Sequence, residues 1–191
     1  MITDRFVVPG HLEKQLGPIT KSWKFVGSDE HGDLQVVRFE DQPVERSVTF
    51  TTLGLSDRIL RADDGRELRE ELVFSCWLRF EHLDIPSVLN HVVDHYCNDH
   101  RALLKGQVLG PGGPLFAGSQ LEAIYCYSPV YFPDSFARVE GVEPPVQFVW
   151  LVPITDSEAH FVRDRGWDAF EDLLVSRDPD VLNLERAGFL G

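Results

Sequence analysis

The chain has 191 residues, and 31 Asp and Glu against 18 Lys and Arg give it a formal charge of −13. Such a charge repels the phosphate backbone of nucleic acids and the anionic headgroups of membranes, so neither is expected as a direct ligand. With 43% hydrophobic and 26% charged residues, the composition is that of a globular protein and not of a disordered acidic tail. A basic protein partner is compatible with this charge, because opposite charges speed association.

The sequence shows no targeting or membrane-spanning segment. Its longest apolar run, 148–152, is far shorter than the roughly 20 residues that a membrane span needs. The N-terminus lacks a basic stretch followed by an apolar one, so no signal peptide is expected. Three widely spaced cysteines, Cys76, Cys97 and Cys126, are typical of free, half-buried thiols in a reducing compartment. We therefore expect a cytoplasmic protein, organised as one domain over residues 1–191.

The first half of the chain is predicted to consist mainly of strands. A short helix is expected at 11–17, where Gly17-Pro18 ends it, and a turn at 29–33. Runs rich in apolar and β-branched residues, separated by turn signals, predict strands at 23–26, 34–39, 47–53 and 68–77.

Helical spacing then replaces the strand pattern. Residues 85–99 are predicted to form an amphipathic helix, introduced by Asp84 with a proline in its first turn. A loop rich in glycine and proline at 106–118 precedes a strand at 121–127. A second loop at 133–145 leads to 146–153, the most apolar strand, which is therefore expected to lie centrally in the sheet.

The last predicted element is helical and covers residues 156–175. Thr155 and Glu158 have the spacing of a capping box at its start, and Gly166 interrupts it, so one helix and two short helices are both open. Strands that lead, a central helix, further strands and a final helical region indicate an α+β fold. We expect a mixed, mostly antiparallel sheet with helices packed on it.

A histidine pair on the central predicted helix is the sharpest candidate for catalytic chemistry. His91 and His95 lie four residues apart, so both could reach one metal ion, as in the inverted zincin motif. Asp94 stands where that motif has its catalytic Glu, and a third ligand would have to come from His82, His100 or a distant carboxylate. The simpler interpretation places both histidines on the solvent-facing side of the helix. A metal-dependent hydrolase is therefore the alternative function, and no cofactor is expected otherwise.

Other catalytic patterns are weaker. The glycines of 106–113 lack a phosphate-binding motif and precede a strand, so they indicate a flexible connection. Glu70 and Glu71 are neighbours on a strand and point to opposite faces, unlike the paired carboxylates of a glycosidase.

The C-terminal region is the most acidic part of the chain. Between residues 156 and 185 nine acidic residues face three arginines, a balance of −6. Asp164, Asp168, Glu171 and Asp172 could share one helix face, either as a solvated surface or as an acidic docking surface. The predicted partner-binding residues are Asp156, Glu158, Asp164, Asp168, Glu171 and Asp172.

Four short motifs, in this order, resemble the suppressor-of-fused domain in its compact bacterial form. They are T-x-G-L-S-D at 52–57, E-L-V-F at 71–74, L-x-P-I-T-x-x-E at 151–158 and D-P-D-V-L-N-L at 178–184. The resemblance covers about residues 20–185. Structural roles are also expected for these motifs: Gly54 permits a tight turn, Pro153 ends a central strand and Glu158 caps a helix.

The resemblance implies a non-enzymatic protein-binding domain with an α+β fold. The animal member of this family restrains zinc-finger transcription factors by gripping a linear peptide beside a strand. No counterpart of that protein's second domain is expected in this sequence, so the peptide clamp is not transferred to particular residues. Bacterial relatives imply an immunity protein that neutralises a co-encoded toxin domain, and the acidic charge suits a basic toxin. A scaffold or homodimer is a further alternative, which exposed aromatic residues at 125–127 and 131–132 would support; the chain is expected to be a monomer or a homodimer.

Overall fold

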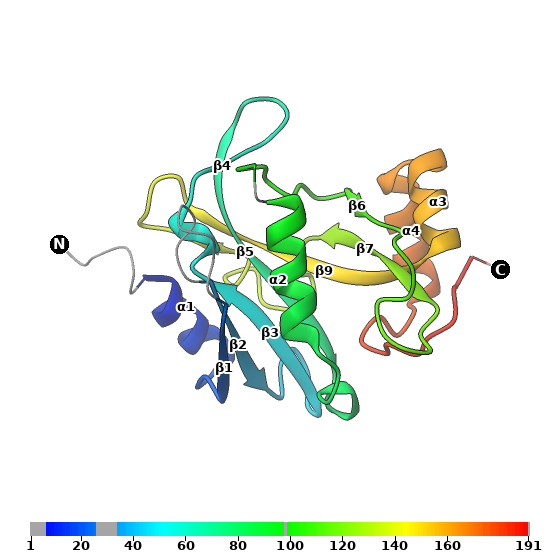
Figure 1. Ribbon diagram of the computed structural model, residues 1–191, viewed down its shortest axis with the longest axis horizontal. Coiled ribbons are helices and arrows are strands. Elements are labelled where there is room, and N and C mark those ends of the chain that lie inside the picture. The colour runs from blue at the N-terminus through cyan, green and yellow to red at the C-terminus, as the bar shows by residue number, and fades with distance from the viewer. Residues whose placement is uncertain (1–6, 26–33, 98, 191) are drawn as a thin grey trace.

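The computed structural model describes residues 7–25, 34–97 and 99–190 (Figure 1). Their strands are β1 (Lys21–Phe25), β2 (Leu34–Glu40), β3 (Ser47–Leu53), β4 (Leu60–Arg61), β5 (Glu67–Trp77), β6 (Val108–Leu109), β7 (Leu121–Tyr127), β8 (Arg138–Val139) and β9 (Val146–Thr155). Their α-helices are α1 (Val7–Leu16), α2 (Ile85–Tyr96), α3 (Asp156–Arg165) and α4 (Trp167–Arg177). Single 3₁₀ turns follow β3 and β5, at Leu55–Asp57 and Leu78–Phe80.

These strands hydrogen-bond into one sheet in the order β1-β2-β3-β5-β9-β7-β6, with β4 paired to β5 and β8 paired to β9. The β5–β9 pair is parallel, and the other pairs of named strands are antiparallel. The predicted α+β fold with a mixed, mostly antiparallel sheet is therefore confirmed. Strand β9 lies between β5 and β7, as its continuous apolar sequence predicted.

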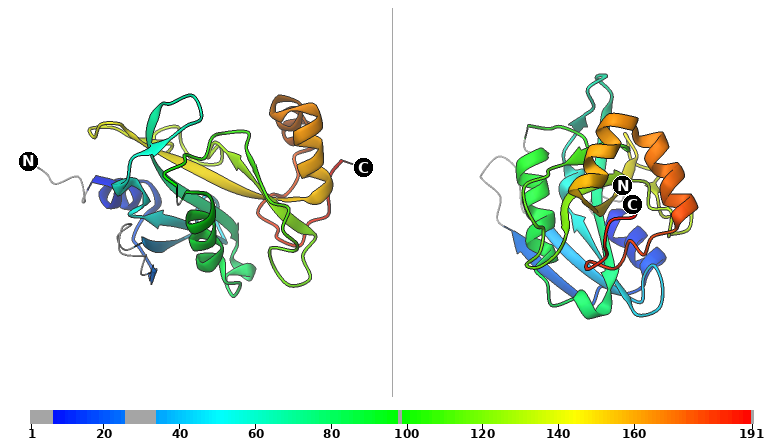
Figure 2. Two further views of the ribbon diagram at one scale, coloured as in Figure 1. Left: turned by 45° about the horizontal axis from the view of Figure 1, so that its top comes forward. Right: turned by 90° about the vertical axis from the view of Figure 1, so that its right-hand side faces the viewer.

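Helices cover both faces of the sheet. Helix α2 lies on one face, while α1, α3 and α4 lie on the other, with α3 and α4 together at one end of the molecule (Figure 2). Two hydrophobic cores result, because each face has its own helix layer. The α2 core includes Leu89, Val92 and Val93, and the opposite core includes Leu12 of α1 and Phe170 of α4. Because both faces are covered, most residues of β5 and β9 are buried, and β9 is apolar over most of its length.

The predicted elements match the structure closely, and the differences have local causes. Strand β3 has the predicted bounds, whereas α1 begins four residues before the predicted 11–17 helix. Helix α2 ends at Tyr96 and not at 99; the Cys97 N–H still bonds to the Val93 carbonyl, and His100 then has a positive φ of 56°. The two-residue strands β4, β6 and β8 were not predicted, because two residues are too few to show the alternation that identifies a strand. The turn predicted at 29–33 lies outside the described residues.

No helix in the described ranges is both long and apolar enough to cross a membrane.

Candidate protein-binding surface

The first two family-like motifs meet at a buried carboxylate. Glu71 of β5 is fully buried, and its carboxylate accepts hydrogen bonds from the Thr52 hydroxyl at 2.6 Å and from the Gly54 N–H at 3.0 Å. The Ser56 N–H and hydroxyl complete the shell at 3.0 and 2.6 Å. Burial raises the pKa of Glu71, and the hydrogen bonds from Ser56, Thr52 and Gly54 oppose that shift. Gly54 adopts a φ of 108°, which a turn around the carboxylate requires and an L-residue rarely adopts. These two motifs therefore build the fold.

The third motif and the segment that follows the fourth motif meet at a second buried carboxylate. Glu158 forms the predicted capping box with Thr155 at the start of α3. Its two oxygens also accept from the Arg186 guanidinium at 2.8 and 2.7 Å, and one accepts from the Phe189 N–H. Glu158 is 0% exposed, so it lies inside the protein and not on an acidic docking surface. This corrects its place among the predicted partner-binding residues.

The D-P-D-V-L-N-L segment also closes onto the sheet. The Trp77 indole N–H at the end of β5 donates to the Asp180 carboxylate at 2.8 and 2.9 Å. The Trp77 backbone N–H donates to the Leu182 carbonyl. The C-terminal segment is thus fixed across the sheet end, which brings Arg186 to Glu158.

Glu70, the neighbour of Glu71, is a second fully buried acid on β5. One of its oxygens accepts from the Leu103 N–H at 2.9 Å, and the other has no hydrogen-bond partner among the described residues. Burial raises the pKa of Glu70 to about 7. Glu70 and Glu71 are consecutive residues of β5, so their side chains point to opposite faces as predicted, but their complete burial was not predicted.

The remaining predicted binding residues lie on α3 and α4. Asp164 belongs to α3, while Asp168, Glu171 and Asp172 belong to α4. Gly166, with a φ of 88° and a ψ of 159°, ends α3 and precedes α4. The prediction that the four acids could share one helix face is therefore wrong.

Each of these acids has different surroundings. Asp164, Asp168 and Asp172 are exposed. Glu171 is largely covered, because its carboxylate accepts from the Tyr125 hydroxyl at 2.7 Å and pairs with Lys105 at 2.9 Å. The carboxylate of half-buried Asp156 lies 3.2 Å from the His160 ring. The acidic surface that α3 and α4 offer to solvent therefore consists of Asp164, Asp168 and Asp172, with Asp156 at its margin. We call these four residues the acidic surface.

The histidine pair of α2 faces solvent. The rings of His91 and His95 are stacked, with centroids 5.3 Å apart, and both side chains are exposed. The ring of His82 hydrogen-bonds to the Arg79 carbonyl, outside this pair. In the described parts of the chain no three His, Cys, Asp or Glu side chains gather as a metal site would need. The arrangement matches the simpler, solvent-facing interpretation of the pair and gives no support to the hydrolase alternative.

The aromatic residues that were expected to be exposed are mostly buried. Tyr125 is 0% exposed and Phe132 is 6% exposed, so neither offers a homodimer contact. Tyr131 is the exception, at 41% exposed.

The three cysteines are free and fully buried, and were expected to be half-buried.

An apolar depression of about 240 Å³ lies between the end of β7, the middle of β9 and the C-terminal end of α4. We call it the apolar groove. Its walls consist of Tyr127, Val130, Tyr131, Trp150, Val152, Leu174, Val175, Asp178, Pro179 and Val181. Tyr131 was among the aromatic residues expected to be exposed, whereas Val175 was not singled out from the sequence, because only the structure shows that it lies outside the buried face of α4.

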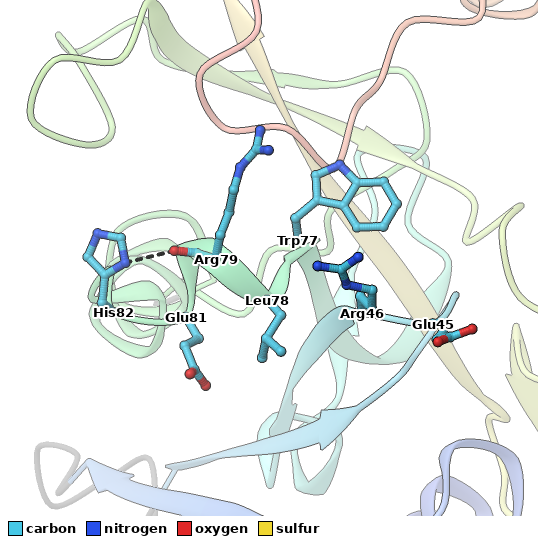
Figure 3. Close-up of a pocket in the computed structure, with 7 residues that line it drawn as sticks. All are labelled: Glu45, Arg46, Trp77, Leu78, Arg79, Glu81 and His82. Atoms are coloured by element: carbon cyan, nitrogen blue, oxygen red, sulfur yellow. Dashed lines mark hydrogen bonds between the residues drawn. The ribbon is translucent and has the colours of Figure 1, made fainter.

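A larger and more open depression of about 810 Å³ lies at the end of β5 (Figure 3). Trp77, Leu78 and Arg79 contribute to it, with Arg46 and Glu45 from the segment before β3 and with Glu81 and His82. Its charges are mixed: Glu81 pairs with Arg38, and Arg79 donates to the Asn183 side chain at 2.9 Å. It therefore has no single charge preference.

Comparison with known proteins identifies the family. The family model described as "Suppressor of fused protein (SUFU)" matches residues 30–187. The chain belongs to the suppressor of fused family. The resemblance drawn from the four motifs is confirmed. The chain is also 22% identical over 170 residues to the immunity protein YqcF of Bacillus subtilis strain 168, covering 88% of this chain and 86% of that protein.

Solved structures of family members share this fold. A suppressor of fused homologue from Neisseria gonorrhoeae FA 1090 superposes with a TM-score of 0.76 at 19% identity, over 96% of this chain and 95% of that one. A chain of the Sufu–Fu complex gives a TM-score of 0.67 at 15% identity, over 95% and 90% of the two chains. Drosophila Suppressor of Fused gives 0.67 at 14% identity, and the match covers 96% of this chain but 50% of the fly protein.

Proposed function

We propose that this member of the suppressor of fused family is a non-enzymatic immunity protein, which binds and neutralises a basic toxin domain through the acidic surface of α3 and α4. The observation that carries the proposal is the similarity to the immunity protein YqcF along nearly the full length of both chains. The net charge of −13 supports a basic partner.

The structure supports a docking role for the acidic surface rather than a catalytic one. Asp164, Asp168 and Asp172 are exposed, and none forms an ion pair among the described residues. Arg163, Arg165 and Arg177 are also exposed on these helices, so the surface is acidic without being uniformly negative. Unpaired carboxylates steer a cationic partner and lose little on contact, because they need not first release a counter-charge.

Co-expression with the toxin-like protein encoded beside this gene tests the proposal. The chain should co-purify with that protein and restore growth to cells that produce it. Failure of both binding and growth rescue would refute the immunity function.

Charge reversal then tests the surface. Asp168→Lys with Asp172→Lys should slow association with that toxin about tenfold at low salt, with a smaller effect at high salt. Glu13→Lys with Glu45→Lys is the matched control, because it also reverses two exposed charges and both residues lie outside α3 and α4. An association rate that is the same for both proteins and independent of salt would contradict the acidic surface.

A further inference from the structure

The exposed apolar side chains of this protein concentrate at the apolar groove. In the described ranges six large apolar side chains are exposed: Val44, Leu78, Val130, Tyr131, Trp167 and Val175. Three of them line the groove, and Val175 is the most exposed of all, at 77%. Contiguous exposed apolar surface costs solubility, so its retention at one place indicates a binding role.

The floor and walls of the groove are built of ordered aromatic rings. The Trp150 ring has Tyr131 against it at 5.0 Å and Tyr127 at 6.2 Å, measured between ring centroids. Trp150 is 2% exposed and stands on the central strand β9, so the floor belongs to the rigid sheet. A volume of about 240 Å³ suits one bulky side chain and is below the usual size of a small-molecule site, about 300 to 1,000 Å³.

The charges around the groove select the occupant. Asp178 is its single charged lining residue, and Asp180 lies close enough to join Asp178 in raising the pKa of Tyr131, a shift whose largest cause is burial. The Asp180 carboxylate also accepts from the Trp77 indole N–H. Lys105, above the Tyr127 ring, is neutralised by Glu171, and Arg177 at the end of α4 is the nearest other cation along the chain.

The groove also continues the acidic surface. Val175 lies one helical turn beyond Asp172 on α4, so a partner bound to the exposed acids of that helix would reach the groove next. A second copy of this chain is a poor occupant, because each copy has a charge of −13.

We propose that the apolar groove receives one bulky apolar side chain of a protein partner, and that a Lys or Arg next to this anchor pairs with Asp178 at the rim. The proposal rests on the proposed function, because it specifies how the toxin is recognised. A buried apolar anchor beside a charge pair is the usual composition of an energetic centre in a protein interface.

Defined peptides test the groove without knowledge of the partner. The probe is acetyl-Gly-Phe-Lys-Lys-Gly-amide, compared with acetyl-Gly-Phe-Glu-Glu-Gly-amide and acetyl-Gly-Ala-Lys-Lys-Gly-amide, each titrated into isotope-labelled protein and followed by NMR. The Phe-Lys-Lys peptide should shift the resonances of Tyr131, Trp150 and Val175 at the lowest concentration. Equal shifts for all three peptides, shifts only elsewhere, or no shift at all would overturn the proposal.

Two variants locate the contact. Val175→Lys should weaken the Phe-Lys-Lys peptide about tenfold, because it places a cation at the groove. Val44→Lys is the matched control, since Val44 is also an exposed valine, at 42%, and lies outside the groove. Asp178→Asn removes the rim charge and keeps the fold, because Asn tolerates the φ of 44° at this position. It should weaken the Lys peptide while leaving the Glu peptide unchanged or bound more tightly.

The same variants separate this proposal from the proposed function. If the toxin binds and Val175→Lys and Asp178→Asn bind it as tightly as Val44→Lys does, the groove assignment is wrong and the immunity function stands. If the peptide contacts the groove but the neighbouring toxin does not bind, the immunity function is wrong and the groove stands.

Discussion

Replacing Arg186 tests how the C-terminal segment is held. Arg186→Met keeps most of the side-chain volume but removes the guanidinium, which contacts both oxygens of the Glu158 carboxylate and donates to the Pro153 carbonyl at 2.9 Å. The two side chains are 5% and 0% exposed, so water cannot replace the lost partner. Glu158 would remain with the N–H groups of Thr155 and Phe189 as its hydrogen-bond donors.

The expected cost follows from the burial of this pair. Breaking a buried ion pair by removal of one partner costs about 3 to 5 kcal/mol, because the other charge stays buried and uncompensated. We therefore expect Arg186→Met to lower the free energy of unfolding by about 4 kcal/mol. The double variant Arg186→Met with Glu158→Gln should recover about 2 kcal/mol of this loss, because the second change removes the buried charge.

Urea unfolding followed by tryptophan fluorescence measures these differences. Arg66→Met provides the control, because Arg66 pairs with Asp64 at 2.7 Å while both side chains are more than half exposed. An exposed pair contributes about 1 kcal/mol or less. Burial does not set the contribution of this ion pair if Arg186→Met lowers the free energy of unfolding no more than Arg66→Met does. The same conclusion follows if the double variant is less stable than Arg186→Met alone.

Three further predictions concern buried groups. Burial raises the pKa of Glu70 from its ordinary value of 4.5 to about 7. As the pH rises, Glu70 therefore ionises in the unfolded chain before it ionises in the folded protein. Its contribution to the free energy of unfolding is fully present below about pH 4.5 and is lost as the pH rises to about 7, a decrease on the order of 3 kcal/mol. Glu70→Gln should reduce the loss of stability with rising pH in urea titrations at several pH values, and an unchanged pH dependence would exclude Glu70 as a source of it. Glu71→Leu should lower the free energy of unfolding by about 4 kcal/mol in the same assay, because the N–H groups of Gly54 and Ser56 lose their acceptor. A decrease no larger than that caused by Ser56→Ala would contradict this expectation. Burial raises the pKa of the Cys76 and Cys97 thiols to about 12 and that of the Cys126 thiol still higher. A thiol reagent should therefore react with these cysteines only as fast as the protein unfolds. Rapid reaction of the native protein would show that the thiols are accessible.

Some contacts of the family-like motifs could be predicted from the sequence, and others only the structure shows. The turn expected at Gly54 and the capping box expected at Glu158 are both present. Pro153 was expected to end the central strand, but it pairs with Ile124 inside β9, which continues to Thr155. The sequence did not predict that Glu71 would gather donors from the T-x-G-L-S-D turn, or that Arg186 would complete the site of Glu158. These contacts join segments 15 and 28 residues apart in the chain, and no local pattern encodes such a pairing.

For the acidic C-terminal region, the sequence located the charged residues but did not show which of them are exposed. Composition located the excess of acids between residues 156 and 185, and spacing suggested one common helix face. The structure divides that segment at Gly166, buries Glu158 and covers Glu171 with Tyr125 and Lys105. Charge counts do not distinguish a carboxylate in solvent from one that has an internal partner.

The sequence by itself determined the α+β class, most strand positions, the central place of β9, the capping box at Thr155 and the family. These features depend on alternation, helical spacing, turn residues and short motifs, which are local properties of the chain. Only the tertiary structure decided which acids reach solvent, and that Val130, Tyr131 and Val175 surround one apolar groove on β9. That groove forms because β7, β9 and the end of α4 converge, and convergence depends on how the helices pack on the sheet and not on the residues of any one segment.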